Sequence, residues 1–462
     1  MASSRERVCP AVAASGGRIS DEPCAAGGAG QLHARSGAEQ ACGVYEELRE
    51  GFARALAATA RADANARAAL LGGAVRLAFH DVGEYDASAP PGERLGADGC
   101  LSRAVVHNGR SDNEGLLHVG SAVAAALEPL WRRHCALVGR ADAWALFARE
   151  ALVAADPTGM LDARLGWSYG RVDAGAAGCE AGAGRLPSAH ADLEVLRTYF
   201  EDQLGLTLAQ GVALFGAHTL GHARPSCSGV GFARESSWTP RPAVLDNAYF
   251  IELVDKRWAR RDAPGGTGSN WQRGPTTRLM LDADMTLAYD VHSSANARAN
   301  QCGERGQCEP FPQTRAIVDR YADNNTAWLE DFADAFEALV SVGYGSDELV
   351  RLDVGACSQH LQVEGIGGAT VEVQTSSGDS ARLHQQGAGA DGAAVSAQTT
   401  SGGSAQLVAG LAGGGAALAA ALVAALGVSW WRRRRGNARG SSDAVKQVPQ
   451  APAAPAISIS TA

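Results

Sequence analysis

Apolar residues recur along most of this chain at the three- and four-residue intervals that place them on one face of an α-helix. Between residues 45 and 352 this spacing dominates, and the two-residue alternation typical of strands is scarce. The spacing predicts helices at residues 44–71, 116–137, 142–154, 192–204, 208–217, 247–258, 313–324 and 327–342. We therefore expect an all-α domain over residues 45–352, preceded by a leader at residues 1–44 that contains Cys and Gly.

The pattern changes after residue 352. Residues 353–406 are mostly small and polar and show no apolar period, which predicts a flexible stalk. Within them, a short alternating stretch at residues 362–374 favours a local hairpin.

Residues 407–431 carry no charged side chain and are long enough to cross a bilayer core of ~30 Å at a rise of ~1.5 Å per residue. The stretch ends in Trp430 and Trp431, and arginines follow at residues 432–435, as expected where a helix leaves the membrane. We expect a transmembrane helix at 407–431 and a basic, then disordered, tail at 432–462. The alternative is a low-complexity tail rich in Ala and Gly.

The cysteines and the net charge narrow the functional class. The chain has 10 cysteines without a CxxC pair, and several, such as Cys179, Cys302 and Cys308, lie in Gly-rich polar sequence. This usage predicts disulfides and an oxidising compartment; the alternative is free thiols in a cytosolic protein. The net charge is −9 and the only prominent basic cluster follows the apolar stretch, so the sequence predicts no nucleic-acid partner.

A first candidate catalytic segment is RLAFHD at residues 76–81, in which Arg76, Phe79 and His80 share one face of a helix. Cleavage of a peroxide needs a base that moves a proton between its oxygens and a fixed positive charge that stabilises the departing oxygen. His80 and Arg76 supply both, and the side-chain carbonyl of Asn113 can accept the second ring N–H of His80. Taken alone, the segment also suits an ordinary core helix.

A second segment places His218 at the end of the apolar stretch 209–217. A neutral imidazole there can ligate iron, and a carboxylate on its other nitrogen makes it a stronger donor. Asp284 is the candidate carboxylate, and Asp282 and Asp290 are competitors that spacing does not exclude. Taken alone, His218 also suits a solvent-facing turn.

Together the two segments resemble those of the plant, fungal and bacterial heme peroxidase superfamily, over about residues 44–347. The resemblance rests on ordered motifs: RLAFHD, GADG followed by NEGL, GRVD with GRLPSA, GLTLAQGVALFGAHTLGHAR, WTPRPAVLDNAYF, LMLDADMTL and VDRYADNNTAWLEDFADAFEALVSVG. The C-terminal half is most similar to the ascorbate and cytochrome c peroxidase class. The resemblance implies a two-lobed helical domain with heme b between a distal and a proximal helix.

On the distal side the resemblance assigns Arg76 and His80 as the catalytic pair, Asn113 as the residue that orients His80, and Phe79 as the aromatic neighbour of the heme. The ascorbate and cytochrome c peroxidase class usually has Trp at the position of Phe79, whereas secreted fungal and plant peroxidases have Phe.

On the proximal side the resemblance assigns His218 as the axial iron ligand and Asp284 as its carboxylate partner. Trp238 matches the proximal tryptophan of the ascorbate and cytochrome c class, a ring that packs on the axial histidine and can hold an oxidising equivalent. The arginine that binds ascorbate is not evident; Cys227 stands at its spacing from His218.

The resemblance also implies two cation sites with oxygen ligands suited to Ca²⁺ or K⁺. The proximal set is Thr219, Thr239 and Asp246, and the candidate distal calcium ligands are Asp81, Gly96 and Asp98. Cys100 stands where the distal site of the family has a Ser oxygen, and a thiol is a poor Ca²⁺ ligand, which weighs against distal calcium.

The expected function is reduction of hydrogen peroxide with oxidation of an unidentified one-electron donor, in peroxide removal and the response to oxidative stress. The alternative is a membrane-anchored heme sensor or pseudo-peroxidase without turnover; a third reading is an adhesion ectodomain without heme. By the positive-inside rule and the cysteine usage, we expect a single-pass membrane protein with its catalytic domain lumenal or extracellular. The leader lacks the sustained apolar core of a signal peptide, which favours the alternative, a tail-anchored protein whose enzyme faces the cytosol or stroma.

Overall fold

The computed structural model describes residues 24, 38–90, 93–104, 112–116, 122–174, 179–224, 230–232, 235–262, 269–292, 301–302, 308–357 and the strands at 362–365, 369–375, 380–386, 396–399 and 405–407. The chain divides into two compact units, Met1–Ser358 and Gln359–Ala462. The first unit contains the helical domain, and both histidine segments belong to it.

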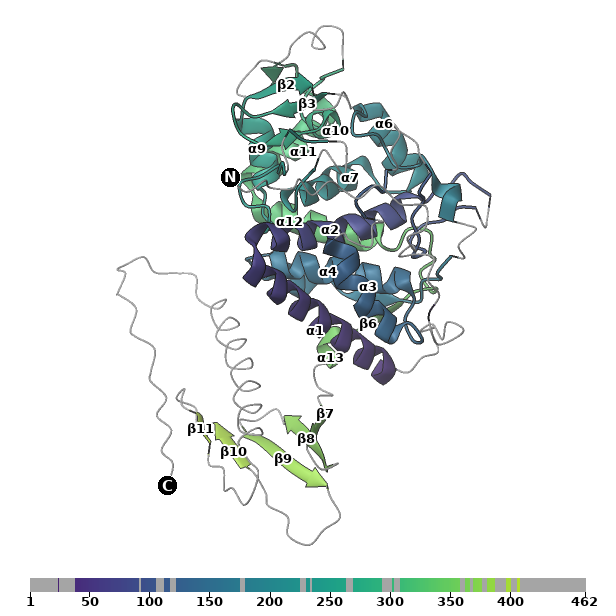
Figure 1. The fold of residues 1–462 in the computed structure, drawn as a ribbon, viewed down its shortest axis with the longest axis vertical. Coiled ribbons are helices and arrows are strands. Elements are labelled where there is room, and N and C mark those ends of the chain that lie inside the picture. Colours follow the sequence, from purple (N-terminus) through teal and green to yellow (C-terminus); the bar gives the residue numbers. More distant parts are fainter. Residues whose placement is uncertain are drawn as a thin grey trace, which may run out of the picture. The chain divides into compact units, whose positions relative to one another are not determined.

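The helices of the first unit form two groups (Figure 1). One group holds α1 (Ala38–Ala62), α2 (Ala64–Gly83), α3 (Ala122–His134) and α4 (Arg140–Ala155), with the short α5 (Met160–Arg164) after it. The other holds α6 (Leu193–Thr198), α7 (Leu208–Phe215), α9 (Ala248–Asp255), α10 (Asp282–Met285), α11 (Pro312–Asp323) and α12 (Asn325–Leu339). The predicted helical domain is confirmed, and nearly every residue of α4 is buried.

Local capping explains where several helices begin and end. Asp63 lies between α1 and α2, and its side chain accepts the N–H of Asn65 as the N-cap of α2. The single helix predicted at 44–71 is therefore wrong: two helices meet at Asp63. Thr207 and Gln210 form a capping box at the start of α7. After α7 a 3₁₀ turn, η3 (Gly216–Thr219), contains His218.

Short strands add to the helices, so the all-α prediction was incomplete. An antiparallel sheet has the order β4-β3-β2-β5, with β2 at Trp258–Asp262, β3 at Ser269–Gln272, β4 at Leu279–Met280 and β5 at Gln301–Cys302. In addition, β1 (Trp167–Tyr169) pairs with β6 (Val350–Leu352). Strands of two to five residues are too short for two-residue alternation to stand out in the sequence.

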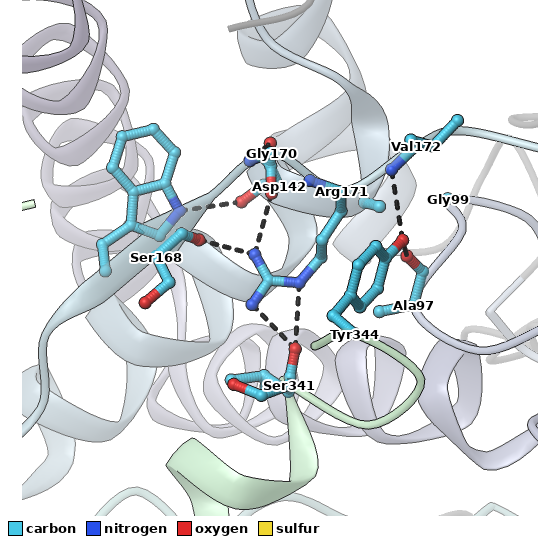
Figure 2. A network of polar contacts seen from close by, with 12 residues as sticks. Ala97, Gly99, Asp142, Ser168, Gly170, Arg171, Val172, Ser341 and Tyr344 are labelled. Atoms are coloured by element: carbon cyan, nitrogen blue, oxygen red, sulfur yellow. Dashed lines mark hydrogen bonds and ion pairs between the residues drawn. The ribbon is translucent and has the colours of Figure 1, made fainter. Parts of the chain in front are cut away.

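A buried ion pair joins α4 to the chain after β1 (Figure 2). The guanidinium of Arg171 donates to Asp142 Oδ1 at 2.8 Å and to the carbonyl of Val340 at 2.7 Å. Beside it, the Tyr344 hydroxyl donates to the carbonyl of Ala97 at 2.9 Å. The network ties α4 and the end of α12 to the segment that precedes Asp98.

Disulfides link several segments of the first unit, which confirms the disulfides that the cysteine usage predicts. They join Cys24 to Cys135, Cys302 to Cys308, and Cys42 in α1 to Cys357 in α13 (Val354–Cys357). The last of these spans 315 residues of sequence and fastens the end of the helical unit to its first helix. Every cysteine in the described part of the chain is disulfide-bonded, Cys100 included.

The second unit contains an antiparallel sheet in the order β11-β10-β9-β8-β7. Its strands are β7 (Gln362–Gly365), β8 (Ala369–Thr375), β9 (Ser380–Gln386), β10 (Ser396–Thr399) and β11 (Ala405–Leu407). The β7–β8 pair confirms the hairpin expected at 362–374. The further strands differ from the predicted flexible stalk, because small polar residues give no apolar period yet still pair through their backbone.

No helix among the described residues is long and apolar enough to cross a membrane. The transmembrane helix predicted at 407–431 lies outside those residues apart from Leu407, and so do the tail at 432–462 and most of the leader.

Candidate active site

Helix α2 presents Arg76, Phe79 and His80 on one face, as the spacing predicts. Arg76 Nε lies 3.2 Å from His80 Nε2. The other guanidinium nitrogens donate to the carbonyls of Asp112 at 3.0 Å and Glu114 at 3.1 Å, which hold the charge beside the histidine. The geometry gives this side of the site a fixed cation next to an imidazole nitrogen.

Asn113 holds the other nitrogen of the distal histidine. His80 Nδ1 lies 2.8 Å from Asn113 Oδ1, so Nδ1 carries the proton and Nε2 keeps its lone pair. Asn113 in turn donates from Nδ2 to Glu84 Oε1 at 2.7 Å and to the Ser102 carbonyl at 2.8 Å. These two acceptors fix the orientation of the Asn113 amide, and with it the tautomer of His80.

Sequence reasoning missed Glu84. This residue is the C-cap of α2 and follows His80 by four positions, so the helical period already placed it on the same face. Its role depends on Ser102, whose backbone N–H donates to Glu84 Oε1 at 2.9 Å and which comes from a different segment. Only the fold brings the two together.

The surroundings of His80 keep it neutral. Burial lowers the pKa of His80 well below its usual value, and the nearby charges of Arg76 and His218 lower it further, against the raising effect of the Asn113 hydrogen bond. The imidazole is therefore available as a base at neutral pH.

The proximal histidine is paired with Asp284, one of the three carboxylates the sequence left open. His218 Nδ1 lies 2.7 Å from Asp284 Oδ1. Asp282 instead contacts His190 Nδ1 at 2.9 Å and Trp271 Nε1 at 2.7 Å. With Nδ1 engaged, His218 keeps Nε2 for a ligand.

Three further donors converge on the same carboxylate, which is fully buried. Trp238 Nε1 and the Leu281 N–H donate to Asp284 Oδ2, each at 2.7 Å, and the Tyr249 hydroxyl donates to Oδ1 at 2.8 Å. The Trp238 ring stacks on His218 with centroids 4.5 Å apart and planes at 22°. Sequence reasoning expected this tryptophan and missed Tyr249, which stands in the same WTPRPAVLDNAYF motif.

The residues present fit a heme. The proximal His218 has a carboxylate on one nitrogen and a free second nitrogen, and its side chain is 34% exposed although Asp284 behind it is 0% exposed. Across from it stand a neutral histidine and a guanidinium. The two sides are held close by Gly72 of α2, where a Cβ would lie 2.7 Å from Gly221 Cα. Histidine is a usual axial ligand for heme iron.

The distal cation candidates form a buried acidic pair. Asp81 and Asp98 both accept the N–H of Cys100, at 3.2 Å each. Burial raises the pKa of Asp98 to about 7, and burial together with Asp98 raises the pKa of Asp81 well above its usual value. Gly96 has a φ of 125°. Cys100 is disulfide-bonded and so offers no thiol. Within the described ranges, no group of three or more His, Cys, Asp or Glu residues is arranged to hold a metal.

The proximal cation candidates are only partly brought together. Thr239 Oγ1 donates to the Thr219 carbonyl at 3.0 Å, and the buried Thr219 Oγ1 has no hydrogen-bond partner in the described part of the chain. Asp246 pairs with Arg241 and accepts the N–H of Ala248 at 3.1 Å.

A histidine braced by a buried carboxylate, facing a neutral histidine and an arginine on a buried helix, is the site of a heme peroxidase. The family model described as "Peroxidase" matches residues 52–302. The chain therefore belongs to the peroxidase family and is a heme enzyme that acts on peroxide, as the ordered motifs predict.

Several relatives show how far the similarity extends. A mitochondrial cytochrome c peroxidase of Aspergillus fumigatus is 29% identical over 300 residues, covering 65% of this chain and 70% of the relative. L-ascorbate peroxidase 3 of Arabidopsis thaliana is 29% identical over 272 residues, covering 58% of this chain and 73% of the relative. A Yarrowia lipolytica protein named for heme binding and peroxidase activity is 30% identical over 270 residues, covering 58% and 77%.

Proposed function

We propose that this protein is a heme b peroxidase that reduces hydrogen peroxide at His80 and Arg76 and takes electrons one at a time from a reductant. The observation that carries the proposal is the opposed pair of histidines, each with its Nδ1 held, His80 by Asn113 and His218 by Asp284. This arrangement leaves Nε2 of His218 for an iron ligand, and it leaves Nε2 of His80, which accepts the Arg76 Nε–H at 3.2 Å, unprotonated for work as a base.

In the proposed mechanism, Nε2 of His218 would hold the heme, whose iron would supply the electrons that reduce peroxide. His80 Nε2 takes the proton from the near oxygen of the peroxide and returns it to the far oxygen, which leaves as water. Arg76 stabilises the negative charge that develops on the leaving oxygen. Asp284 makes His218 a stronger donor, which favours the ferric state.

The first prediction concerns the distal base. His80→Leu is expected to slow the reaction with peroxide by about 10²- to 10⁴-fold, the usual contribution of a general acid–base residue, because it removes the imidazole nitrogen that would take the peroxide proton. The measurement is the stopped-flow rate of the change in the heme absorption band on mixing with peroxide. His134→Leu is the matched control, because His134 pairs with Glu47 at the end of α3. An unchanged rate in His80→Leu would show that the distal assignment is wrong.

The electron donor is open to experiment. Two relatives carry cytochrome c and ascorbate in their names, and the Trp238 ring on His218 supports electron transfer through the proximal side. Comparing catalytic efficiency with ascorbate, cytochrome c, Mn²⁺ and phenols identifies the class of donor. A role in peroxide removal under oxidative stress predicts that cells lacking the protein accumulate peroxide.

We also propose a cation beside the proximal histidine, held by Thr219 and Thr239, since the buried Thr219 hydroxyl lacks a partner in the described residues. Asp246 would join them by leaving Arg241. The buried Asp81 and Asp98, with the backbone of Gly96, are a weaker candidate for calcium because Cys100 supplies no oxygen. Metal analysis of the purified protein, before and after treatment with a chelator, tests both sites.

For location we propose a single-pass protein anchored through residues 407–431, with the catalytic domain in a lumenal or extracellular space. The disulfides support an oxidising compartment, and the sequon at Asn324 is compatible with it. Protease protection of the catalytic domain in sealed microsomes is the expected result. Digestion of that domain in intact vesicles would instead indicate a tail-anchored enzyme facing the cytosol or stroma.

A further inference from the structure

A row of contacting aromatic rings extends from the proximal histidine toward the surface formed by α11 and α12. The His218 and Tyr249 centroids are 6.0 Å apart, those of Tyr249 and Phe250 are 5.0 Å apart, and those of Phe250 and Tyr321 are 5.1 Å apart. All these spacings lie within the range of about 4.5–7 Å for aromatic rings in contact. Rings packed in this way are common in helical cores, so spacing alone assigns them no role beyond packing.

The hydroxyl partners of Tyr249 and Tyr321 distinguish this row of rings from ordinary packing. Tyr249 donates to Asp284 Oδ1 at 2.8 Å, and Tyr321 donates to Asp331 Oδ2 at 2.7 Å. By contrast, the hydroxyl of Tyr289, also buried in this lobe, lies 3.5 and 3.4 Å from the backbone carbonyls of Leu253 and Val254. A phenol that loses an electron becomes strongly acidic, so its oxidation requires a base within hydrogen-bond reach. Tyr249 and Tyr321 each have such a base.

The outer end of the row of rings lies directly beneath the protein surface. Tyr321 itself is 1% exposed. Its acceptor, Asp331, is 40% exposed and pairs with Arg320, which is 52% exposed. A molecule that touches this ion pair is therefore separated from the Tyr321 ring only by the Asp331 and Arg320 side chains.

We propose that Tyr249 and Tyr321 form a one-electron relay that carries an oxidising equivalent from the proximal side of the heme site to the surface at Asp331 and Arg320. The substrate class is a phenolic one-electron donor too bulky to approach His80. A phenol suits this end because it can give one electron to an oxidised tyrosine of similar potential and release its own proton to solvent. The relay rests on the proposed peroxidase function, in which peroxide is the oxidant.

The steps balance in electrons and protons. Tyr249 loses one electron toward the proximal side while its phenolic proton moves to Asp284. Tyr321 then gives one electron to Tyr249, which recovers its proton from Asp284, and the Tyr321 proton moves to Asp331. A phenol at the surface gives one electron to Tyr321 and releases one proton to solvent as it becomes a phenoxyl radical. Asp331 returns its proton to Tyr321.

The test uses the heme-loaded full chain mixed with one equivalent of hydrogen peroxide, frozen, and examined by electron paramagnetic resonance. A tyrosyl radical is expected in the wild type and in the control Tyr289→Phe. In Tyr321→Phe the oxidising equivalent should stop at Tyr249, so any tyrosyl radical that remains should map to Tyr249. In Asp331→Asn, which keeps the ring and removes the proton acceptor, the yield of the Tyr321 radical should fall. Trapping with a nitroso spin trap and peptide mass mapping should place the adduct on Tyr321.

An adduct that maps to Tyr199, Trp238 or Trp328 and spares Tyr321 in the wild type, or that spares Tyr249 in Tyr321→Phe, would overturn the relay. The same holds if Asp331→Asn leaves the yield unchanged. If the wild type consumes peroxide with a small donor and forms no Tyr321 radical, the relay fails and the peroxidase function stands. If the wild type does not react with peroxide, both fail. The heme absorption band of each variant verifies that it has folded.

Discussion

At the scale of single residues, His80 shows how a sequence motif acquires its chemistry from the fold. The RLAFHD motif predicts that His80 and Arg76 share a helix face, and α2 confirms it. The state of His80, however, depends on burial, on the Arg76 charge and on Asn113. Helical spacing predicts that Arg76 is near His80, but neither the burial of His80 nor its contact with Asn113 can be read from that spacing.

The surroundings of His80 predict a pH profile. Because its pKa lies well below the usual value, His80 remains a neutral base as pH falls through about 6.5, the value for an unperturbed histidine. The rate of reaction with peroxide is therefore expected to stay level through that range and to fall only in more acid solution, where His80 becomes protonated. In Arg76→Leu one cause of the lowering is gone, so the decline should move to higher pH. A profile in which the wild type and Arg76→Leu decline at the same pH would contradict this.

The carboxylate behind His218 gives a second prediction. Asp284→Asn removes the negative charge that accepts the His218 N–H, so the iron ligand becomes a weaker donor and the reduction potential of the heme iron should rise. Spectroelectrochemical titration measures it. Asp282→Asn is the matched control, because Asp282 lies two positions away and contacts His190 and Trp271 instead. Equal shifts in both variants would contradict the assignment of Asp284.

At the scale of elements, clear apolar periodicity predicted the helices well. Short or weak patterns did not predict the strands. Helices α7, α11 and α12 lie where the apolar spacing placed them. The break at Asp63 was missed because apolar spacing continues across it, although the side chain that starts α2 is a typical N-cap. The sheet formed by β2 to β5 was missed because its strands are short, and because β5 pairs with β2 across the intervening β3 and β4.

The ion pair of Figure 2 supports a prediction at this scale. Arg171→Ala leaves Asp142 as an unpaired carboxylate in a fully buried position, so the free energy of unfolding should fall by about 3–5 kcal/mol. Chemical denaturation followed by circular dichroism measures the change. Replacing both partners with apolar residues, as in Asp142→Leu with Arg171→Met, should recover most of the loss. A loss below about 1 kcal/mol in Arg171→Ala, as for a surface pair, would contradict the account.

At the scale of the whole molecule, ordered motifs predicted the family, and the family model match shows it. The sequence also predicted which residues would meet across the heme site, because seven short motifs in family order constrain one another. Spacing alone could not choose among Asp282, Asp284 and Asp290, although the family resemblance assigned Asp284. Neither found Glu84 or Tyr249, because their roles depend on contacts between distant segments. The second unit was the weakest prediction, since small polar residues carry little pattern.

We assign His80 and His218 to the two faces of one heme site, His80 as the base and His218 as the iron ligand. The most direct measurement is a heme titration of the purified wild type, His218→Ala and His80→Leu, read from the heme absorption band and followed by mixing with peroxide. His218→Ala should weaken heme binding or alter the ligation spectrum, whereas His80→Leu should bind heme like the wild type and hardly react with peroxide. If His218→Ala binds heme with an unchanged spectrum, or if His80→Leu loses heme, the assignment of the two faces is contradicted.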